Sequence, residues 1–407
     1  MVQQVTLCNL LSRFMNTNIL DPEFLRKKSF DVDPLVDQLI QDIITSDGQE
    51  AIKNLFSQLT DNSDIIKNTE VNSKIAAYFN AEMSLPDWAD PKQISIAEDL
   101  FALYGLEISF LLNFRSLPLC YSSKSGSKVL YSTGRLREQG QNTSKMTRRL
   151  METSQMIVNV MSPGGLDPMG NGIVTIKKVR LMHASIRYYL KHPHINQNGW
   201  DVEALGEPIN QEEMAGTLMS FGPLIMNGLD LLGVDVNKEQ KDAYMHCWNI
   251  VGHFIGLNPD LMPKDNEEGW KLGIEILTRN KETSTEGKAL GKSIVQFGKD
   301  IFPGYFFDDM PAYFIKYFTR DVSEIVGVDF ANLIGINPKP TLKRKFVAWL
   351  TTFIFDKVSD IQKRSWFISK ISRWINIKLM QGLINYYLKN STAQFDVPPS
   401  LKDNWKI

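Results

Sequence analysis

Two helix-forming runs with a loop of helix breakers between them constrain the fold of this chain more than any other feature. Residues 147–161 and 173–191 carry apolar side chains at helical spacing and contain neither proline nor glycine. The intervening residues 162–172 include two prolines and four glycines, which interrupt helices. Two helices joined by a short loop pack against each other, so the sequence predicts a buried helical hairpin.

The rest of the chain contains no strand-rich block, internal repeat or low-complexity tract. We therefore predict an all-α fold, and 407 residues are enough to bury a large core. Asn210 is the expected N-cap, with Glu213 placed for a capping box, of a helix over Met214–Leu232. Residues 117–141 are rich in serine and glycine, and predict a loop with at most one short hairpin around 129–131.

Composition shifts divide the chain into three expected segments. Residues 1–93 form an N-terminal helical segment that packs on the core, and residues 94–336 form the core itself. Residues 337–407 are C-terminal helices in which basic and aromatic residues interleave. Those helices either contact a membrane surface peripherally or pack as a pair with a solvated basic face.

The first helix of the hairpin carries three polar residues on one face. Arg149, Glu152 and Thr153 stand at positions i, i+3 and i+4, which lie together on a helix surface. Arg149 with Glu152 is compatible with an ordinary surface ion pair. The same three side chains are also candidates for a polar, catalytic side of an apolar site.

The second helix carries a lone histidine, His183, beside apolar residues and two arginines. Arg180 and Arg187 lie three residues before and four after it, at helical spacing. A hydrogen-bonded core histidine would give this pattern. A haem would also give it, because haem needs one neutral imidazole for iron, an apolar wall for the macrocycle and cations for two propionates.

Of the four other histidines, His246 and His253 are the rival candidates for an iron ligand. His246 and His253 share one helix face, but seven residues separate them by about 10.5 Å, which is too far for both to bind one ion. Packing in the core is the expected role of each. His192 and His194 flank a proline and are expected to be solvated rather than to bind a metal.

Charge, cysteine content and hydropathy exclude several classes of protein. The net charge of −1 argues against bulk electrostatic attraction to nucleic acid or to anionic membranes. Cys8, Cys120 and Cys247 form neither a CxxC motif nor a zinc spacing, which indicates a reducing compartment. The N-terminus does not resemble a signal peptide, and the longest apolar run, 346–355, is too short to span a bilayer. We therefore expect a cytoplasmic protein without a transmembrane segment.

The order of several motifs resembles one family. Arg149-x-x-Glu152-Thr153 is followed by the glycine and proline loop and by Arg180-Leu-Met-His183-Ala-Ser-Ile-Arg187. Two further blocks agree, Gly206–Thr217 and Trp248–His253. Together they resemble the latex-clearing rubber oxygenases and the relatives that cleave the farnesyl chain in mycophenolic acid biosynthesis, over roughly residues 20–330.

This resemblance implies a globin-like core of helices that binds haem b. His183 would be the iron ligand, with Arg180 and Arg187 binding the cofactor, and Arg149 and Thr153 would act on dioxygen at the distal side. The sequence departs from the best-known rubber oxygenase at Glu152, where that enzyme has a lysine, and upstream, where 128–135 lacks an acid to match its glutamate base. We therefore expect Glu152 to serve as the distal base.

We therefore expect a haem b-dependent oxygenase that uses dioxygen to cleave or oxidise a lipophilic substrate, of which an isoprenoid is the expected example. Two alternatives predict different behaviour. A non-catalytic haem or apolar-ligand binding protein would not consume oxygen, and a cofactor-free interaction protein would be colourless. The sequence does not specify the oligomeric state.

Overall fold

The computed structural model describes residues 19–48, 73–81, 83–132, 144–168, 170–192, 199–301, 308–364 and 366–388. Over these ranges the protein is helical, which confirms the predicted all-α fold. The described residues form no sheet, and their one strand-like contact is an isolated bridge between Ser123 and Lys281. None of the described helices is long and apolar enough to cross a membrane. Cys8 lies outside the described residues.

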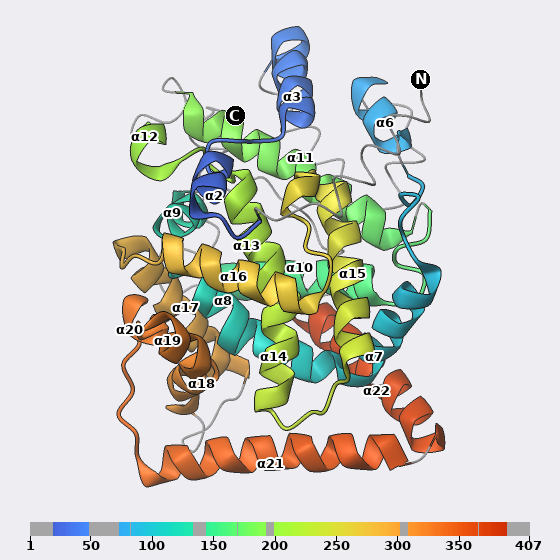
Figure 1. Ribbon diagram of the computed structural model, residues 1–407, viewed down its shortest axis with the longest axis vertical. Helices are drawn as coiled ribbons and strands as arrows, with labels where there is room; N and C mark the ends of the chain where they lie inside the picture. The colour runs from blue at the N-terminus through green and yellow to red at the C-terminus, as the bar shows by residue number, and fades with distance from the viewer. Residues whose placement is uncertain are drawn as a thin grey trace.

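The helices wrap around one core (Figure 1). Their bounds are α2 Pro22–Lys28, α3 Pro34–Asp47, α6 Ser73–Asn80, α7 Pro91–Leu111, the π-helix η1 Leu112–Ser116, α8 Leu117–Cys120, α9 Lys124–Ser132, α10 Ser144–Met161, α11 Asn171–Lys191, α12 Val202–Leu205, α13 Gln211–Phe221, α14 Pro223–Leu231, α15 Lys238–Ile255, the 3-10 helix η2 Pro259–Leu261, α16 Asn266–Asn280, α17 Thr285–Ile301, α18 Met310–Phe318, α19 Arg320–Val326, α20 Phe330–Leu333, α21 Leu342–Arg364 and α22 Trp366–Leu388.

The predicted helical hairpin is present as α10 and α11, which pack against each other. Glycine is required in the loop between them, because the backbone closes tightly there. A Cβ at Gly165 would lie 2.2 Å from the Asn159 carbonyl oxygen, and one at Gly172 would lie 2.5 Å from the Gly165 carbonyl oxygen. The loop therefore brings the start of α11 directly onto the end of α10.

Helix α11 is buried along nearly its whole length, between α10, α3 and α15. In Figure 1 it crosses the upper part of the molecule behind the other helices. The main buried cluster extends from Ile19 through α11 to Ile384 in α22, so each of the three expected segments contributes to it. The segment boundaries themselves stay a prediction.

Two local expectations were wrong. The helix expected over Met214–Leu232 breaks into α13 and α14, because Pro223 disfavours helical geometry at Gly222. Asn210 does cap α13, with its side chain accepting from the Glu213 amide at 2.9 Å. The stretch expected as a loop with a hairpin contains α8 and α9, which pack on α13 and α17 respectively.

A fully buried arginine, Arg115, connects four helical elements through hydrogen bonds and an ion pair. Arg115 in η1 donates to the Leu224 carbonyl at 2.8 Å, to Phe318 and Asn227, and to both carboxylate oxygens of Asp321 at 2.7 and 2.9 Å. Burial opposes ionisation of Asp321, but the hydrogen bonds and charge of Arg115 outweigh it and hold the pKa of that carboxyl below its ordinary value. The arginine thereby joins η1, α14, α18 and α19.

We predict that Arg115→Met will destabilise the protein by roughly 3–5 kcal/mol, because it leaves the partly buried Asp321 carboxylate without its cation and the Leu224 and Phe318 carbonyls without their donor. Urea unfolding followed by circular dichroism measures this change. Lys92→Met, which removes an exposed pair with Glu239, is the matched control and should leave the midpoint nearly unchanged. Equal effects of the two substitutions would contradict the role assigned to Arg115.

Candidate functional site

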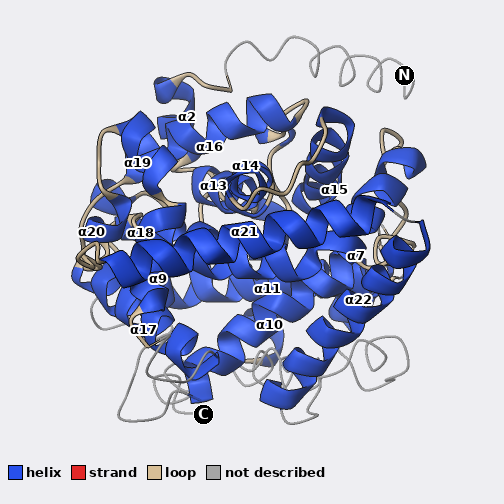
Figure 2. Cartoon of the chain, turned by 90° about the horizontal axis from the view of Figure 1, so that it is seen from below, coloured by secondary structure: helices blue, strands red, loops and turns tan. Residues whose placement is uncertain are grey.

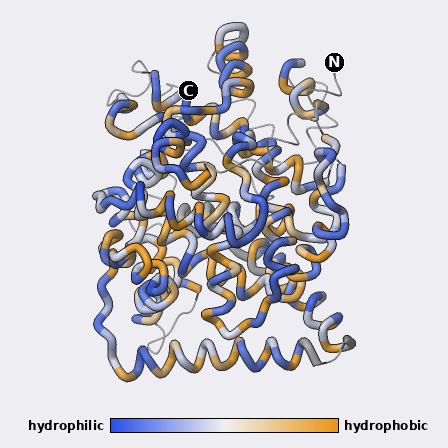
Figure 3. Tube along the Cα trace, in the orientation of Figure 1, coloured by the Kyte–Doolittle hydropathy of each residue, from blue (hydrophilic) through white to orange (hydrophobic). Residues whose placement is uncertain are grey.

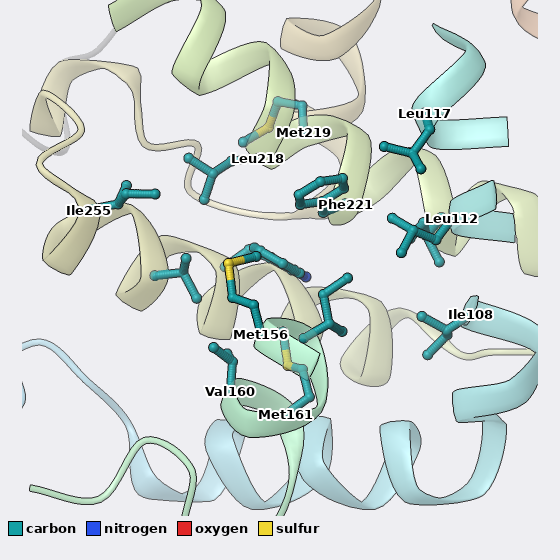
Figure 4. Close-up of a cluster of buried hydrophobic side chains, with 14 of the residues drawn as sticks. Ile108, Leu112, Leu117, Met156, Val160, Met161, Leu218, Met219, Phe221 and Ile255 are labelled. Carbon is teal, nitrogen blue, oxygen red and sulfur yellow. The ribbon is translucent and has the colours of Figure 1, made fainter. Parts of the chain in front are cut away.

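An apolar cavity of about 260 Å³ lies between the α10–α11 hairpin and the helices α8, α9, α13, α15 and α16. Figure 4 shows part of its wall, with the side chain of Met156 from α10 below those of Leu218 and Phe221 from α13. Most of the wall is made of aliphatic, aromatic and methionine side chains. Apolar members are Leu117, Val129, Leu150, Met156, Val179, Met182, Ile186, Met214, Leu218, Phe221, Trp248, Val251, Ile255 and Ile276.

Three residues expected at a site from the sequence meet in this cavity. Glu152 and Thr153 line it from α10, and His183 lines it from α11. Glu152 is buried, whereas Thr153 and His183 are partly exposed. Arg149 lies in α10, one turn before Thr153, but its side chain falls outside the described residues. The cavity therefore brings together the three polar side chains of Glu152, Thr153 and His183 within a mainly apolar wall.

The two arginines expected to bind the cofactor do not line the cavity. Arg180 forms a two-point pair with Asp33, at 2.6 and 3.0 Å, and Arg187 pairs with Asp37 at 2.8 Å. Both acids lie at the start of α3, one helical turn apart. Burial raises the pKa of Asp37, and the Arg187 charge offsets part of this rise. The structure therefore gives both guanidiniums structural partners on α3, and their expected role in binding a cofactor stays a prediction.

Helix geometry explains why Arg180 and Arg187 face α3 while His183 lines the cavity. Successive residues are about 100° apart, so Arg180 and Arg187 both lie roughly 50° to one side of the histidine. The remaining cavity-lining residues of α11 lie on its other side, and these are Val179, Met182 and Ile186. His183 thus stands at the border between an apolar face toward the cavity and a basic face toward α3.

A strained turn connects the basic face to the cavity wall. Ile209 lines the cavity with φ of 53°, the only positive φ at a non-glycine residue in the described part of the chain. A β-branched residue is rarely found there, because its Cβ collides with the backbone. Arg187 donates to the Ile209 carbonyl at 3.2 Å, and the next residue, Asn210, caps α13. The arginine therefore holds the turn that positions α13.

Sequence reasoning assigned Glu213 to a helix cap and missed its place in the cavity wall. Its side chain is half-buried, and its carboxyl accepts a hydrogen bond from the Ser125 hydroxyl of α9. Burial raises the pKa of Glu213 to about 7, partly opposed by that hydrogen bond. A carboxyl that titrates near neutrality can give and take a proton at physiological pH. The sequence feature that could have revealed this place is an acidic residue on the apolar face of α13.

The rival histidines lie outside the cavity wall. The His246 and His253 rings both make edge contacts with Trp88, at 5.6 and 6.2 Å between centroids, and His246 Nε2 accepts from the Asp90 amide at 2.9 Å. His192 stacks on the Tyr188 ring, and His194 falls outside the described residues. In the described ranges, no three histidine, cysteine or acidic side chains cluster as metal ligands.

A helical fold with an apolar cavity that has one imidazole and two carboxyls in its wall has the features of a protein built to hold an apolar ligand or cofactor. Residues 119–352 match the family described as ER-bound oxygenase mpaB/B'/Rubber oxygenase, catalytic domain. The chain belongs to this oxygenase family, as the sequence resemblance predicted. The match contains every residue of the cavity wall except Leu117.

Two relatives agree with this assignment. The chain is 22% identical to the rubber oxygenase of Streptomyces sp. (strain K30) over 334 residues, which cover 81% of this chain and 75% of the relative. Its fold is similar to that of latex clearing protein LCP in the closed state, with a TM-score of 0.66 and 18% identity. That likeness covers 88% of this chain and 91% of the solved chain.

We predict that Glu213→Gln will flatten the dependence of stability on pH. Between about pH 4.5 and 7 the folded protein retains the Glu213 proton that the unfolded chain releases, so the glutamate makes stability fall as pH rises. The substitution removes a change on the order of 2–3 kcal/mol in the free energy of unfolding between these two pH values. Urea unfolding at several pH values measures it, with the exposed Glu239→Gln as control; parallel pH profiles of Glu213→Gln and the unsubstituted protein would contradict the assignment.

Proposed function

We propose that the protein is a haem b-dependent oxygenase that uses dioxygen to cleave or oxidise a lipophilic substrate such as an isoprenoid. The observation that carries this proposal is the His183 imidazole in the wall of an otherwise apolar cavity. Membership of the oxygenase family supports the reaction type. One relative is a rubber oxygenase, which supports a substrate of the isoprenoid class.

The donor set of the cavity fits a haem. A neutral imidazole is the ligand that haem iron takes in many proteins, and His183 offers one beside Val179, Met182 and Ile186. When bound, haem b supplies the chemistry that activates dioxygen. The propionates would need a cation other than Arg180 or Arg187, because both are paired with α3. Lys281 is the only lysine or arginine among the described residues lining the cavity.

The remaining polar side chains have two roles in the proposed reaction, hydrogen-bond donation and proton transfer. Thr153, one turn along α10 from Arg149, presents a hydroxyl that can donate to an oxygen atom in the cavity. Glu152 and Glu213 are the carboxyls of the wall, and either can hold a proton beside the substrate. We assign the proton-holding role near neutral pH to Glu213, because burial raises its pKa to about 7.

The apolar wall selects the substrate. Three methionines, Met156, Met182 and Met214, line the cavity, and their flexible side chains adapt to irregular apolar ligands. Burying an apolar chain against this wall is favourable in proportion to the area removed from water. The same wall keeps bulk water away from the reacting atoms.

We predict that His183→Ala will abolish retention of haem when the protein is produced with haem supplied, because the wall then lacks its imidazole. His246→Ala and His253→Ala are matched controls and should retain haem, since both rings pack on Trp88 outside the cavity. Haem content per chain measures the difference. Loss of haem in either control, with retention in His183→Ala, would reassign the ligand.

We predict that the haem-loaded protein consumes oxygen only when an isoprenoid alkene is added. In the Arg149→Ala variant, haem should be retained while the rate of oxygen consumption falls at least tenfold. The expectation follows from the place of Arg149 in the family motif. An oxygen electrode measures the rate, and Arg320→Ala on α19 serves as an arginine control. A haem protein that never consumes oxygen with such alkenes would favour the non-catalytic ligand-binding alternative.

A further inference from the structure

The outward face of α21 carries a stripe of large apolar side chains. Leu342, Phe346, Trp349 and Phe353 follow one another at helical spacing with 88%, 54%, 55% and 44% of their surfaces exposed. Figure 2, seen from below, shows α21 lying lengthwise across the surface of the molecule. A helix that covers a core in water turns its apolar stripe inward, so an outward stripe requires an explanation.

The aromatic rings of this stripe form a continuous row. The ring centroids of Phe346 and Trp349 are 5.9 Å apart, and those of Trp349 and Phe353 stack at 5.4 Å. The Lys357 ammonium lies 5.7 Å from the centroid of the Phe353 ring. Tryptophan beside lysine is typical of helices that lie at the interface between lipid and water.

Helix α22 packs against α21 and exposes a second apolar stripe. Its exposed large side chains, from 38% to 64% by surface, are Ile368, Ile371, Trp374, Ile375 and Leu379. We call the two stripes together the α21–α22 surface. Figure 3 shows hydrophobic and hydrophilic residues alternating along α21 at the bottom of the molecule.

The same two helices concentrate positive charge. Leu342–Leu388 contains 9 lysines and arginines against 2 aspartates, a balance of +7, in a chain whose overall balance is −1. The rest of the chain is therefore negative, with a balance of −8. An apolar stripe flanked by cations is complementary to a bilayer with anionic headgroups. The apolar side chains can contact the acyl chains while the cations contact the phosphates.

We propose that the α21–α22 surface docks on an anionic lipid bilayer, with the helices lying in the headgroup region rather than crossing it. A second copy of this chain is a poorer partner. The two helices carry a balance of +7, and Asp309 and Asp99 of other elements offset only part of it. A two-fold contact would therefore place one basic surface against another, and like charges repel across an interface. The inference does not depend on haem or on the proposed reaction.

Flotation of the full-length protein with vesicles tests the proposal. We expect binding to phosphatidylcholine vesicles that contain about 30% phosphatidylserine, weaker binding to phosphatidylcholine alone, and weakening by salt. Phe346→Ser with Trp349→Ser should reduce the partition coefficient at least tenfold. Leu35→Ser with Ile325→Ser is the matched control, because those side chains are 64% and 59% exposed on other helices.

A second pair of variants tests the charges. Lys345→Glu with Lys378→Glu should weaken binding to the anionic vesicles, whereas Lys264→Glu with Lys292→Glu, exposed elsewhere, should not. Unchanged thermal unfolding midpoints show that the variants fold. No binding to anionic vesicles would overturn the proposal, as would equal binding by all variants. A concentration-dependent dimer that Phe346→Ser with Trp349→Ser dissolves would assign the surface to a second copy.

Discussion

Burial of α11 on all sides is the constraint on which the rest of the structure depends. A helix in this position must provide a partner for every polar group it carries, because an unpaired buried charge is strongly destabilising. Arg180 and Arg187 meet this requirement through Asp33 and Asp37 of α3. The pairs fix the rotation of α11 about its axis, so that His183 and the apolar residues beside it line the cavity.

One of these paired arginines, Arg187, also stabilises the opposite wall of the cavity. Arg187 also donates to the carbonyl of Ile209, whose positive φ is sustained only because neighbouring contacts define the turn. Asn210 follows and caps α13, which brings Glu213 into the wall. A cluster of ion pairs outside the cavity thereby positions a carboxyl inside it, and Ser125 of α9 completes the arrangement.

The sequence predicts those features that local patterns determine. The α10–α11 hairpin, the cap at Asn210 and the place of His183 follow from spacing and from breaker residues. The arginines, Glu213 and α9 do not, because their environments arise from helices distant in the sequence. Arg180 shares helical spacing with His183, yet a rotation of roughly 50° directs it to α3, and no pattern on α11 alone reveals that partner.

A titration of haem into cofactor-depleted protein tests most directly the proposal that the cavity beside His183 receives haem. The absorption spectrum should develop a sharp Soret band that saturates at one haem per chain, with the band position of an imidazole-ligated b-type haem. A broad spectrum that rises without saturation would show non-specific binding, and would contradict the cofactor assignment while leaving the fold and family unchanged.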